Sequence, residues 1–220
     1  MQKLIIPSAI ILCLFTTSCN KSSNNTAPIA NATVGMSMKA TNGNGGQSEY
    51  HLNWSSCIAN ASYARFEGKI HQIRYTTQTN ITGPIDLYAP VPIANATFSI
   101  PTGPYQQASL SINMANTNAH PAMLLHGNYV EHTSLVPVDL IIGQDLVLNT
   151  EFKDITVTNN TVAAFTTLDM AYYSEGVTPE MLENAETTIG GNVIISITSN
   201  KPIYDIIVNN LSTKRASLSF

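Results

Sequence analysis

The histidines are the residues of this sequence with the clearest capacity for metal binding and proton transfer. There are five of them, and the segment from His126 to His132 (HGNYVEH) also contains Glu131, so two imidazoles and a carboxylate lie close together along the chain. Zinc sites that can be recognised in a sequence have compact spacings such as HExxH or paired CxxC, and neither occurs here. We therefore expect surface or hydrogen-bonded histidines, with no metal and no cofactor.

Carboxylates and serines are the next candidates, because a glycosidase needs two acidic side chains across a sugar-binding cleft. The aspartates among the strand-like segments are single and scattered: Asp86, Asp139, Asp145, Asp154 and Asp169. The chain has no GxSxG nucleophile motif and no glycine-rich phosphate loop. We expect no catalytic residue and a protein that is not an enzyme. A carbohydrate-processing enzyme with an unrecognised carboxylate pair stays open as an alternative.

Aromatic side chains offer a binding chemistry, because tryptophan and tyrosine rings can stack on sugars when several share one exposed face. The candidate binding residues are Trp54, Tyr88, Tyr105 and Tyr129. The same residue types also fill β-sheet cores with their polar ends at the rim. Core or rim packing is the favoured interpretation, and the binding interpretation stays open.

The composition limits the classes of partner. Asp, Glu, Lys and Arg make up 11% of the chain, against roughly 25% in an average soluble protein. Hydrophobic residues reach 44%, which is enough to build a core and argues against a disordered chain. Ten basic and 14 acidic residues give a net charge of −4 without a basic block, so we expect no nucleic-acid partner.

The amino terminus has the pattern of a targeting segment. Lys3 gives the first residues a positive charge, and residues 4–15 (LIIPSAIILCLF) are apolar apart from Ser8. A helix that spans a bilayer needs roughly 20 residues, more than this run supplies. The sequence therefore predicts a secretory signal peptide over residues 1–18 rather than a transmembrane anchor.

The signal peptide ends in small residues that lead into a cysteine, Thr16-Thr17-Ser18-Cys19. This order resembles the lipobox of bacterial lipoproteins, although it departs at Thr16, where leucine is usual. The resemblance implies a lipidated Cys19 that anchors the protein to a membrane of the cell envelope, with the outer membrane favoured. Several acyl chains together give stable anchorage. The alternative is an ordinary cleaved signal peptide that contains a cysteine.

The remaining cysteines fit this interpretation. Cys13 lies in the predicted signal peptide and Cys19 is the expected lipid site, so Cys57 has no partner for an intramolecular disulfide. We expect Cys57 to be a small buried hydrophobic residue. The domain must then be held together by core packing instead of the disulfides common in small exported domains.

Residues 19–30 are polar and turn-prone, as in a flexible tether, and short segments with period-two alternation follow them. Strands are expected at 34–40, 50–54, 62–75 (one or two around Gly68), 85–88, 96–100, 107–114, 122–125, 135–142, 145–152, 155–158, 162–173, 192–198, 203–208 and 216–220. One short helix is expected near 179–189, with Thr178 as its N-cap and Pro179 at its first position.

Many short strands and a single helix predict an all-β fold, an antiparallel β-sandwich of Ig-like or prealbumin-like type. We expect one β-sandwich domain over residues 31–220. A boundary near Asn159 is the alternative, but few strands follow it to form an independent core.

Three segments carry a further resemblance: residues 64–75 (ARFEGKIHQIRY), 85–88 (IDLY) and 99–107 (SIPTGPYQQ). Together they are similar to exported lipoproteins of Bacteroidota, of uncharacterised function, with a prealbumin-like (transthyretin-like) sandwich. The resemblance covers strands and turns, so it implies a fold and a location but no active site.

These observations predict a lipid-anchored cell-envelope protein that acts as a non-catalytic binding module for a glycan, a peptide or another envelope protein. A carbohydrate-processing enzyme and a structural, adhesin-like surface component are the alternatives. An exposed aromatic strip would favour glycan binding, and a cleft with two carboxyl groups would favour an enzyme.

Overall fold

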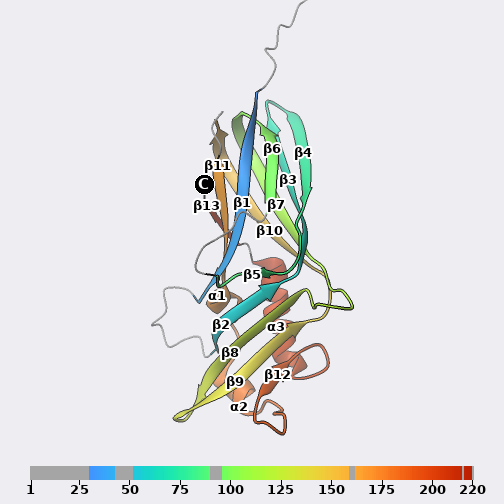
Figure 1. Cartoon of the computed structure of the whole chain (residues 1–220). Coiled ribbons are helices and arrows are strands. Elements are labelled where there is room, and N and C mark those ends of the chain that lie inside the picture. Colours follow the sequence, from blue (N-terminus) through green and yellow to red (C-terminus); the bar gives the residue numbers. More distant parts are fainter. Residues whose placement is uncertain (1–29, 43–51, 90–95, 159–161, 215, 220) are drawn as a thin grey trace, which may run out of the picture.

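The structure is a computed structural model that describes residues 30–42, 52–89, 96–158, 162–214 and 216–219 (Figure 1). These residues form mostly strands, with three helices, and most of the strand pairs are antiparallel. The expectation of an all-β chain rich in antiparallel sheet is therefore confirmed. The predicted signal peptide and the tether up to residue 29, Cys19 included, lie outside the described residues.

The strands form three sheets. The first has the order β13-β11-β1-β6, with β1 (Asn31–Thr41), β6 (Ala96–Pro101), β11 (Val162–Asp169) and β13 (Ser217–Ser219). The second has the order β10-β7-β3-β4, with β3 (Ala61–Ile70), β4 (Ile73–Asn80), β7 (Gly103–Met114) and β10 (Leu146–Val157). The third has the order β12-β9-β8-β2-β5, with β2 (Leu52–Ala59), β5 (Ile85–Asp86), β8 (Met123–Glu131), β9 (Ser134–Ile142) and β12 (Val193–Ile195).

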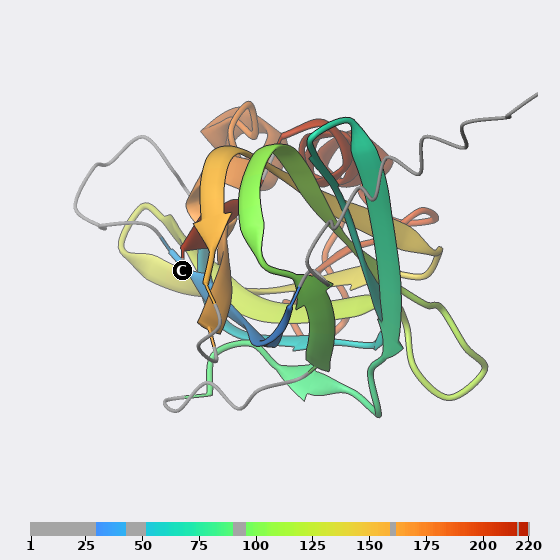
Figure 2. The ribbon, with the colours of Figure 1, turned by 90° about the horizontal axis from the view of Figure 1, so that it is seen from above.

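The inner faces of the first and second sheets share one interior, which Figure 2 shows end-on. Strand alternation turns every second side chain inward, such as Met36 on β1 and Leu110 on β7. A small apolar cavity of about 20 Å³ is lined from both sheets by Val34, Met36, Phe66, Phe98, Ile100, Leu110, Phe152 and Ala164. The apolar half of each alternating strand is therefore used for contact between the sheets, and the polar half faces solvent.

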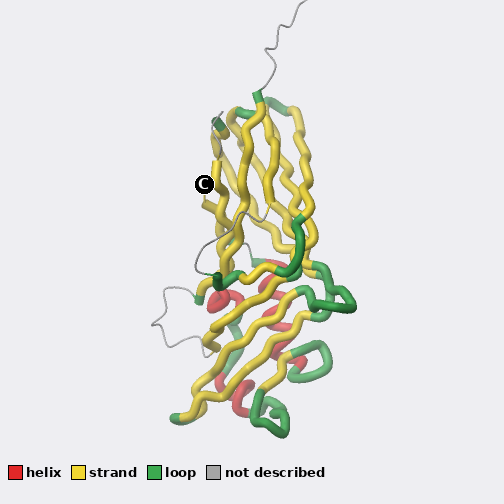
Figure 3. The backbone as a smooth tube through the Cα atoms, in the orientation of Figure 1, coloured by secondary structure: helices red, strands yellow, loops and turns green. Residues whose placement is uncertain are grey.

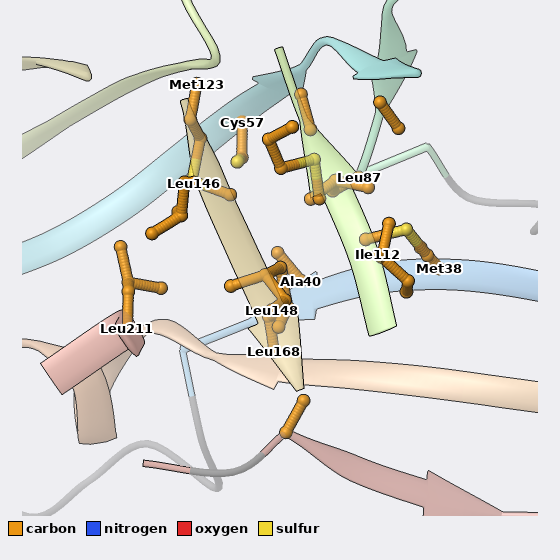
Figure 4. Packing of buried hydrophobic residues seen from close by; sticks show 14 of the residues in the cluster. Met38, Ala40, Cys57, Leu87, Ile112, Met123, Leu146, Leu148, Leu168 and Leu211 are labelled. Atoms are coloured by element: carbon orange, nitrogen blue, oxygen red, sulfur yellow. The ribbon is translucent and has the colours of Figure 1, made fainter. Parts of the chain in front are cut away.

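All three helices lie at the end of the molecule that holds the third sheet (Figure 3). They are α1 (Met170–Tyr173), α2 (Pro179–Glu183) and α3 (Lys201–Thr213). Leu211 of α3 belongs to the same buried cluster as Leu146 and Leu148 of β10 (Figure 4). One contiguous core therefore runs from the first two sheets into the third. No helix in the described ranges is long and apolar enough to cross a bilayer.

Asn60 connects the second and third sheets, because it is the single residue between β2 and β3. Its backbone N–H donates to Ala122 O at 2.9 Å, and its carbonyl accepts from Ala115 N at 2.9 Å. Its side-chain Nδ2 also donates to Ala115 O at 2.6 Å. These bonds hold the chain at the point where β7 leaves the second sheet and β8 enters the third.

The helix expectation is corrected in number and extent. The expected helix near 179–189 is α2, which begins as predicted with Thr178 Oγ1 accepting from Met181 N at 3.3 Å, but ends at Glu183. Asn184 is its C-cap residue, and its backbone N–H and its Nδ2 both donate to Glu180 O. The expected strand 162–173 ends at Asp169, whose carboxylate caps α1.

The expected strand at 203–208 is wrong, because this segment lies in α3. Its buried residues are Ile203, Tyr204, Ile207, Asn210 and Leu211, which share one helical face. The strand expectation around Gly68 is also corrected. β3 passes through Gly68, and the turn to β4 falls at His71 and Gln72, which both have positive φ.

Candidate functional site

The aromatic residues predicted to bind sugars do not share an exposed face. Trp54, Tyr105 and Tyr129 have exposed fractions of 1%, 1% and 4%, and Tyr88 is half-buried against the same core. The Trp54 indole Nε1 donates to Ser174 Oγ at 3.1 Å. The hydroxyls of Tyr105, Tyr129 and Tyr88 donate to Pro101 O, Leu182 O and Asn42 Oδ1. The polar end of each of these side chains has a hydrogen-bond partner inside the protein. These four residues therefore pack in or against the core.

The tyrosines are neutral core phenols. Burial raises the pKa of Tyr105 to about 12 and also raises the pKa values of Tyr88 and Tyr129. The Tyr105 ring lies directly over Gly68 of β3, where an added Cβ would be 2.6 Å from the ring. It also meets Phe66 edge-on, with 5.5 Å between ring centroids. Tyr105 is therefore an internal packing element of the second sheet.

The histidine segment forms a surface hydrogen bond between His126 and Asp139. His126 Nδ1 lies 2.6 Å from Asp139 Oδ1 across the β8–β9 pair, and both side chains reach solvent. His132 has a positive φ in the turn between these strands. In the described ranges, no three His, Cys, Asp or Glu side chains gather as metal ligands would.

Cys57 lies in the core, as expected, with no exposed surface. Burial raises the pKa of its thiol, and the neighbouring Asp86 carboxylate raises it further. The thiol is therefore protonated at neutral pH, whereas nucleophilic attack needs the thiolate.

The outward face of the second sheet carries polar side chains from all four of its strands. On β3, Ala64, Phe66 and Ile70 point inward and are buried, so the alternate residues point outward. The same alternation on β7, β10 and β4 turns serine, asparagine, glutamine, threonine and charged side chains to solvent. We call this surface the polar face.

Strand register arranges the polar face into four rows that cross the sheet from β10 through β7 and β3 to β4. The first row, called the lysine row, is Lys153, Gln107, Lys69 and Arg74, and the second, called the glutamate row, is Glu151, Ser109, Glu67 and Thr76. The third row is Asn149, Ser111, Arg65 and Gln78. The fourth row is Val147, Asn113, Tyr63 and Asn80. Neighbouring strands lie roughly 4.8 Å apart, and successive rows roughly 6.7 Å apart.

Two hollows indent the polar face. The first, of about 250 Å³, is lined by the lysine row and by Glu67, Ser109 and Glu151 of the glutamate row. The second, of about 290 Å³, is bounded by Ser109, Ser111, Asn149 and Glu151 on the sheet and by Ser212, Thr213 and Lys214 at the end of α3. Ser109 and Glu151 line both hollows, so the two adjoin. Each is close to the lower end of the size range of small-molecule sites in proteins, roughly 300–1,000 Å³.

The polar face is held by bonds within and between its rows. Arg65 pairs with Glu67 at 2.6 Å, and Arg74 lies 3.9 Å from the other oxygen of the same carboxylate. Ser111 Oγ donates to Asn149 Oδ1 at 2.8 Å, and Asn113 Nδ2 donates to Ser62 Oγ at 2.8 Å. Arg65, Glu67, Ser111 and Asn149 therefore hold one another on the surface around the hollows.

The fourth row adds apolar contact area to the polar face. Tyr63 projects from β3 on the outward side and is partly exposed, and Val147 on β10 is 41% exposed. Amide side chains lie between and beside them on β7 and β4. The polar face thus offers donors, acceptors and one aromatic ring, the groups that can bind the hydroxyls and the apolar side of a sugar.

A carboxylate pair also lies on this face. Glu67 and Glu151 flank Ser109 from the two neighbouring strands, so two strand spacings, roughly 9.6 Å, separate their backbones. Sequence reasoning considered scattered aspartates and passed over these glutamates, because they lie far apart in the chain and are brought together only by strand register.

Comparisons of this chain with models of known protein families, with curated proteins and with solved structures find no match.

Proposed function

We propose that this protein is a non-catalytic binding module whose polar face binds a glycan. The observation that carries the proposal is the pair of adjoining hollows on an open sheet face lined by hydroxyl, amide and charged side chains. Sugar hydroxyls both donate and accept hydrogen bonds, so they match a surface that offers serine and amide groups in register. Tyr63 supplies a ring for stacking at the far row.

The hollows can be filled with one substitution, because Ser109 lies in the middle of the sheet and lines both of them. Ser109→Trp should abolish binding to any polysaccharide that the wild type retains on an array of immobilised neutral and acidic polysaccharides. Ser99→Trp is the matched control, since Ser99 is exposed on β6 in the first sheet. The proposal fails if the array retains no protein, or if both variants bind as the wild type does.

The second candidate function is a carbohydrate-processing enzyme, which the Glu67 and Glu151 pair favours. Inverting glycosidases place their two carboxyl groups roughly 6.5–9.5 Å apart. Against this role, Glu67 is already held by Arg65 and Arg74. Incubation with the bound polysaccharide distinguishes the functions: unchanged chain length supports a binding module, and release of reducing ends that Glu151→Gln removes identifies an enzyme.

We propose in addition that the module is anchored in the cell envelope by a lipid on Cys19 and belongs to the outer membrane. The support is the apolar segment 4–15 followed by Thr17, Ser18 and Cys19. Residues 20–29 would then tether the module to the membrane. Asn31 opens β1 at the end of the molecule remote from the third sheet (Figure 1), so the polar face would run along the side of the anchored domain.

We assign the first and second sheets to an antiparallel β-sandwich of Ig-like or prealbumin-like type. The assignment is supported by two four-stranded sheets whose inner faces line the same small cavity. The parallel pairing of β1 with β11 is a departure from a purely antiparallel arrangement. The third sheet and its helices would then be an addition to this sandwich.

A further inference from the structure

We propose that the ligand of the polar face is an acidic polysaccharide, whose carboxylate or sulfate group is bound between Lys69 and Lys153 over Gln107. This inference rests on the proposed function and specifies its substrate class. It starts from an imbalance of charge: the chain has a net charge of −4, yet Arg65, Lys69, Arg74 and Lys153 project from this one face.

The two lysines lie on either side of Gln107 in the lysine row. Their backbones are separated by two strand spacings, roughly 9.6 Å, and each side chain has a long flexible stem. Both ammonium groups can therefore reach one oxyanion placed above the Gln107 amide. Arg74 continues the row on β4 and borders the same hollow.

The lysines also differ from most other cations of the described chain in lacking an ionic partner. Arg65 and Arg74 pair with Glu67, Lys201 pairs with Asp205, and Lys214 pairs with Glu175. No carboxylate of the described residues lies within ion-pair distance of Lys69 or Lys153. Within the described residues, the hollow thus presents two ammonium groups without an ion pair, beside the Glu67 and Glu151 carboxylates that line it.

The next row excludes a ligand with a continuous run of negative charge. Glu67 and Glu151 lie one row, roughly 6.7 Å, from the lysines, with Ser109 between them. A nucleic acid that followed the strands would place further phosphates near these carboxylates and be repelled. A polysaccharide that carries an acidic group on one unit and hydroxyls around it can match both rows.

The test uses polymer pairs that differ only in charge. Wild-type protein should bind a largely methyl-esterified polygalacturonate, in which the remaining acidic units are isolated, at least about tenfold more tightly than the fully esterified polymer. Sparsely sulfated dextran against neutral dextran tests sulfate as the acidic group, and single-stranded poly(A) RNA tests a nucleic acid. Raising the salt concentration from about 0.05 M to about 0.5 M should weaken only the binding of charged polymers.

The variants then assign the effect to the lysines. Lys69→Gln combined with Lys153→Gln should weaken binding to the preferred acidic polymer at least about tenfold and leave binding to its neutral counterpart unchanged. Lys39→Gln combined with Lys201→Gln is the control, because it removes the same charge from other surfaces and should have no such effect.

The two proposals fail in different ways. The acidic-ligand proposal alone fails if Ser109→Trp abolishes binding but the wild type binds neutral and acidic polymers equally. It also fails alone if the two double variants lose the same amount of affinity for the acidic polymer. Tighter binding of poly(A) than of any polysaccharide would overturn the assignment of a polysaccharide as the ligand. Binding that Ser109→Trp does not affect would overturn the polar face as the site.

Discussion

At the scale of residues, the same chemical types serve two purposes in this protein. Trp54 and Tyr105 have the groups needed to bind sugars, but their polar ends are bonded inside the fold. Tyr63 has the same chemistry and faces outward, because it lies on the other side of β3 from Ala64 and Phe66. Residue type alone therefore cannot separate a binding aromatic from a core aromatic, whereas the side of the strand can.

The burial of Cys57 can be tested by the reactivity of its thiol. In the chain with Cys13→Ser and Cys19→Ser, a maleimide should leave Cys57 unlabelled in the folded state and label it fully in denaturant, because burial and Asp86 raise its thiol pKa. Thr33→Cys, added on the exposed side of β1, is the positive control and should react in the folded state. Labelling of folded Cys57 as rapid as that of the control would contradict its burial.

At the scale of elements, alternation in the sequence was sufficient to place most strands, and Thr178 with Pro179 was sufficient to place the start of α2. It failed at 203–208, since the short run Ile203 to Val208 fits a buried strand and a helix equally well. Pro202 and the spacing of Ile203, Ile207 and Leu211 are the signals that indicate a helix. Alternation also shows which side chains of one strand share a face, but it does not show which side chains of different strands are neighbours across the sheet. The rows of the polar face come from register between strands far apart in the chain.

Asn210 tests how α3 is fixed to the rest of the fold. Its buried Nδ2 donates to Tyr173 O, at the end of α1, at 2.9 Å and to Glu175 O, just after α1, at 2.8 Å. Asn210→Asp replaces this donor with an acceptor facing two carbonyls, which should lower the free energy of unfolding by about 1–3 kcal/mol in denaturant titration. Asn209→Asp, on the exposed side of the same helix, should change it little. Equal effects of the two variants would contradict the assigned role of Asn210.

At the scale of the whole molecule, the chain has few charged residues, and its basic residues are unevenly distributed over the surface. Thr, Ser, Asn and Gln replace ionic groups on most of the surface, so the few basic residues have a large local influence where they gather. Four of them lie on the polar face of an otherwise acidic chain. A tethered domain with one such face could bind a polymer lying along its side.

Lipidation is tested on the intact chain in cells. Radiolabelled palmitate should enter the wild-type protein and should not enter Cys19→Ala, because Cys19 is the residue at which the lipobox resemblance places the lipid. The variant should also leave the membrane fraction. Equal labelling of both proteins would contradict the anchor, and it would leave the binding face unaffected.

The central claim is that the polar face binds a polysaccharide, and the affinity ratio between Ser109→Trp and Ser99→Trp tests it most directly. Both variants place the same large side chain on the outward side of a strand, one at the half-buried Ser109 between the two hollows and one at the exposed Ser99 on the opposite sheet. With both proteins shown to be folded, we predict wild-type affinity for Ser99→Trp and no measurable binding for Ser109→Trp. Equal affinities would contradict the account.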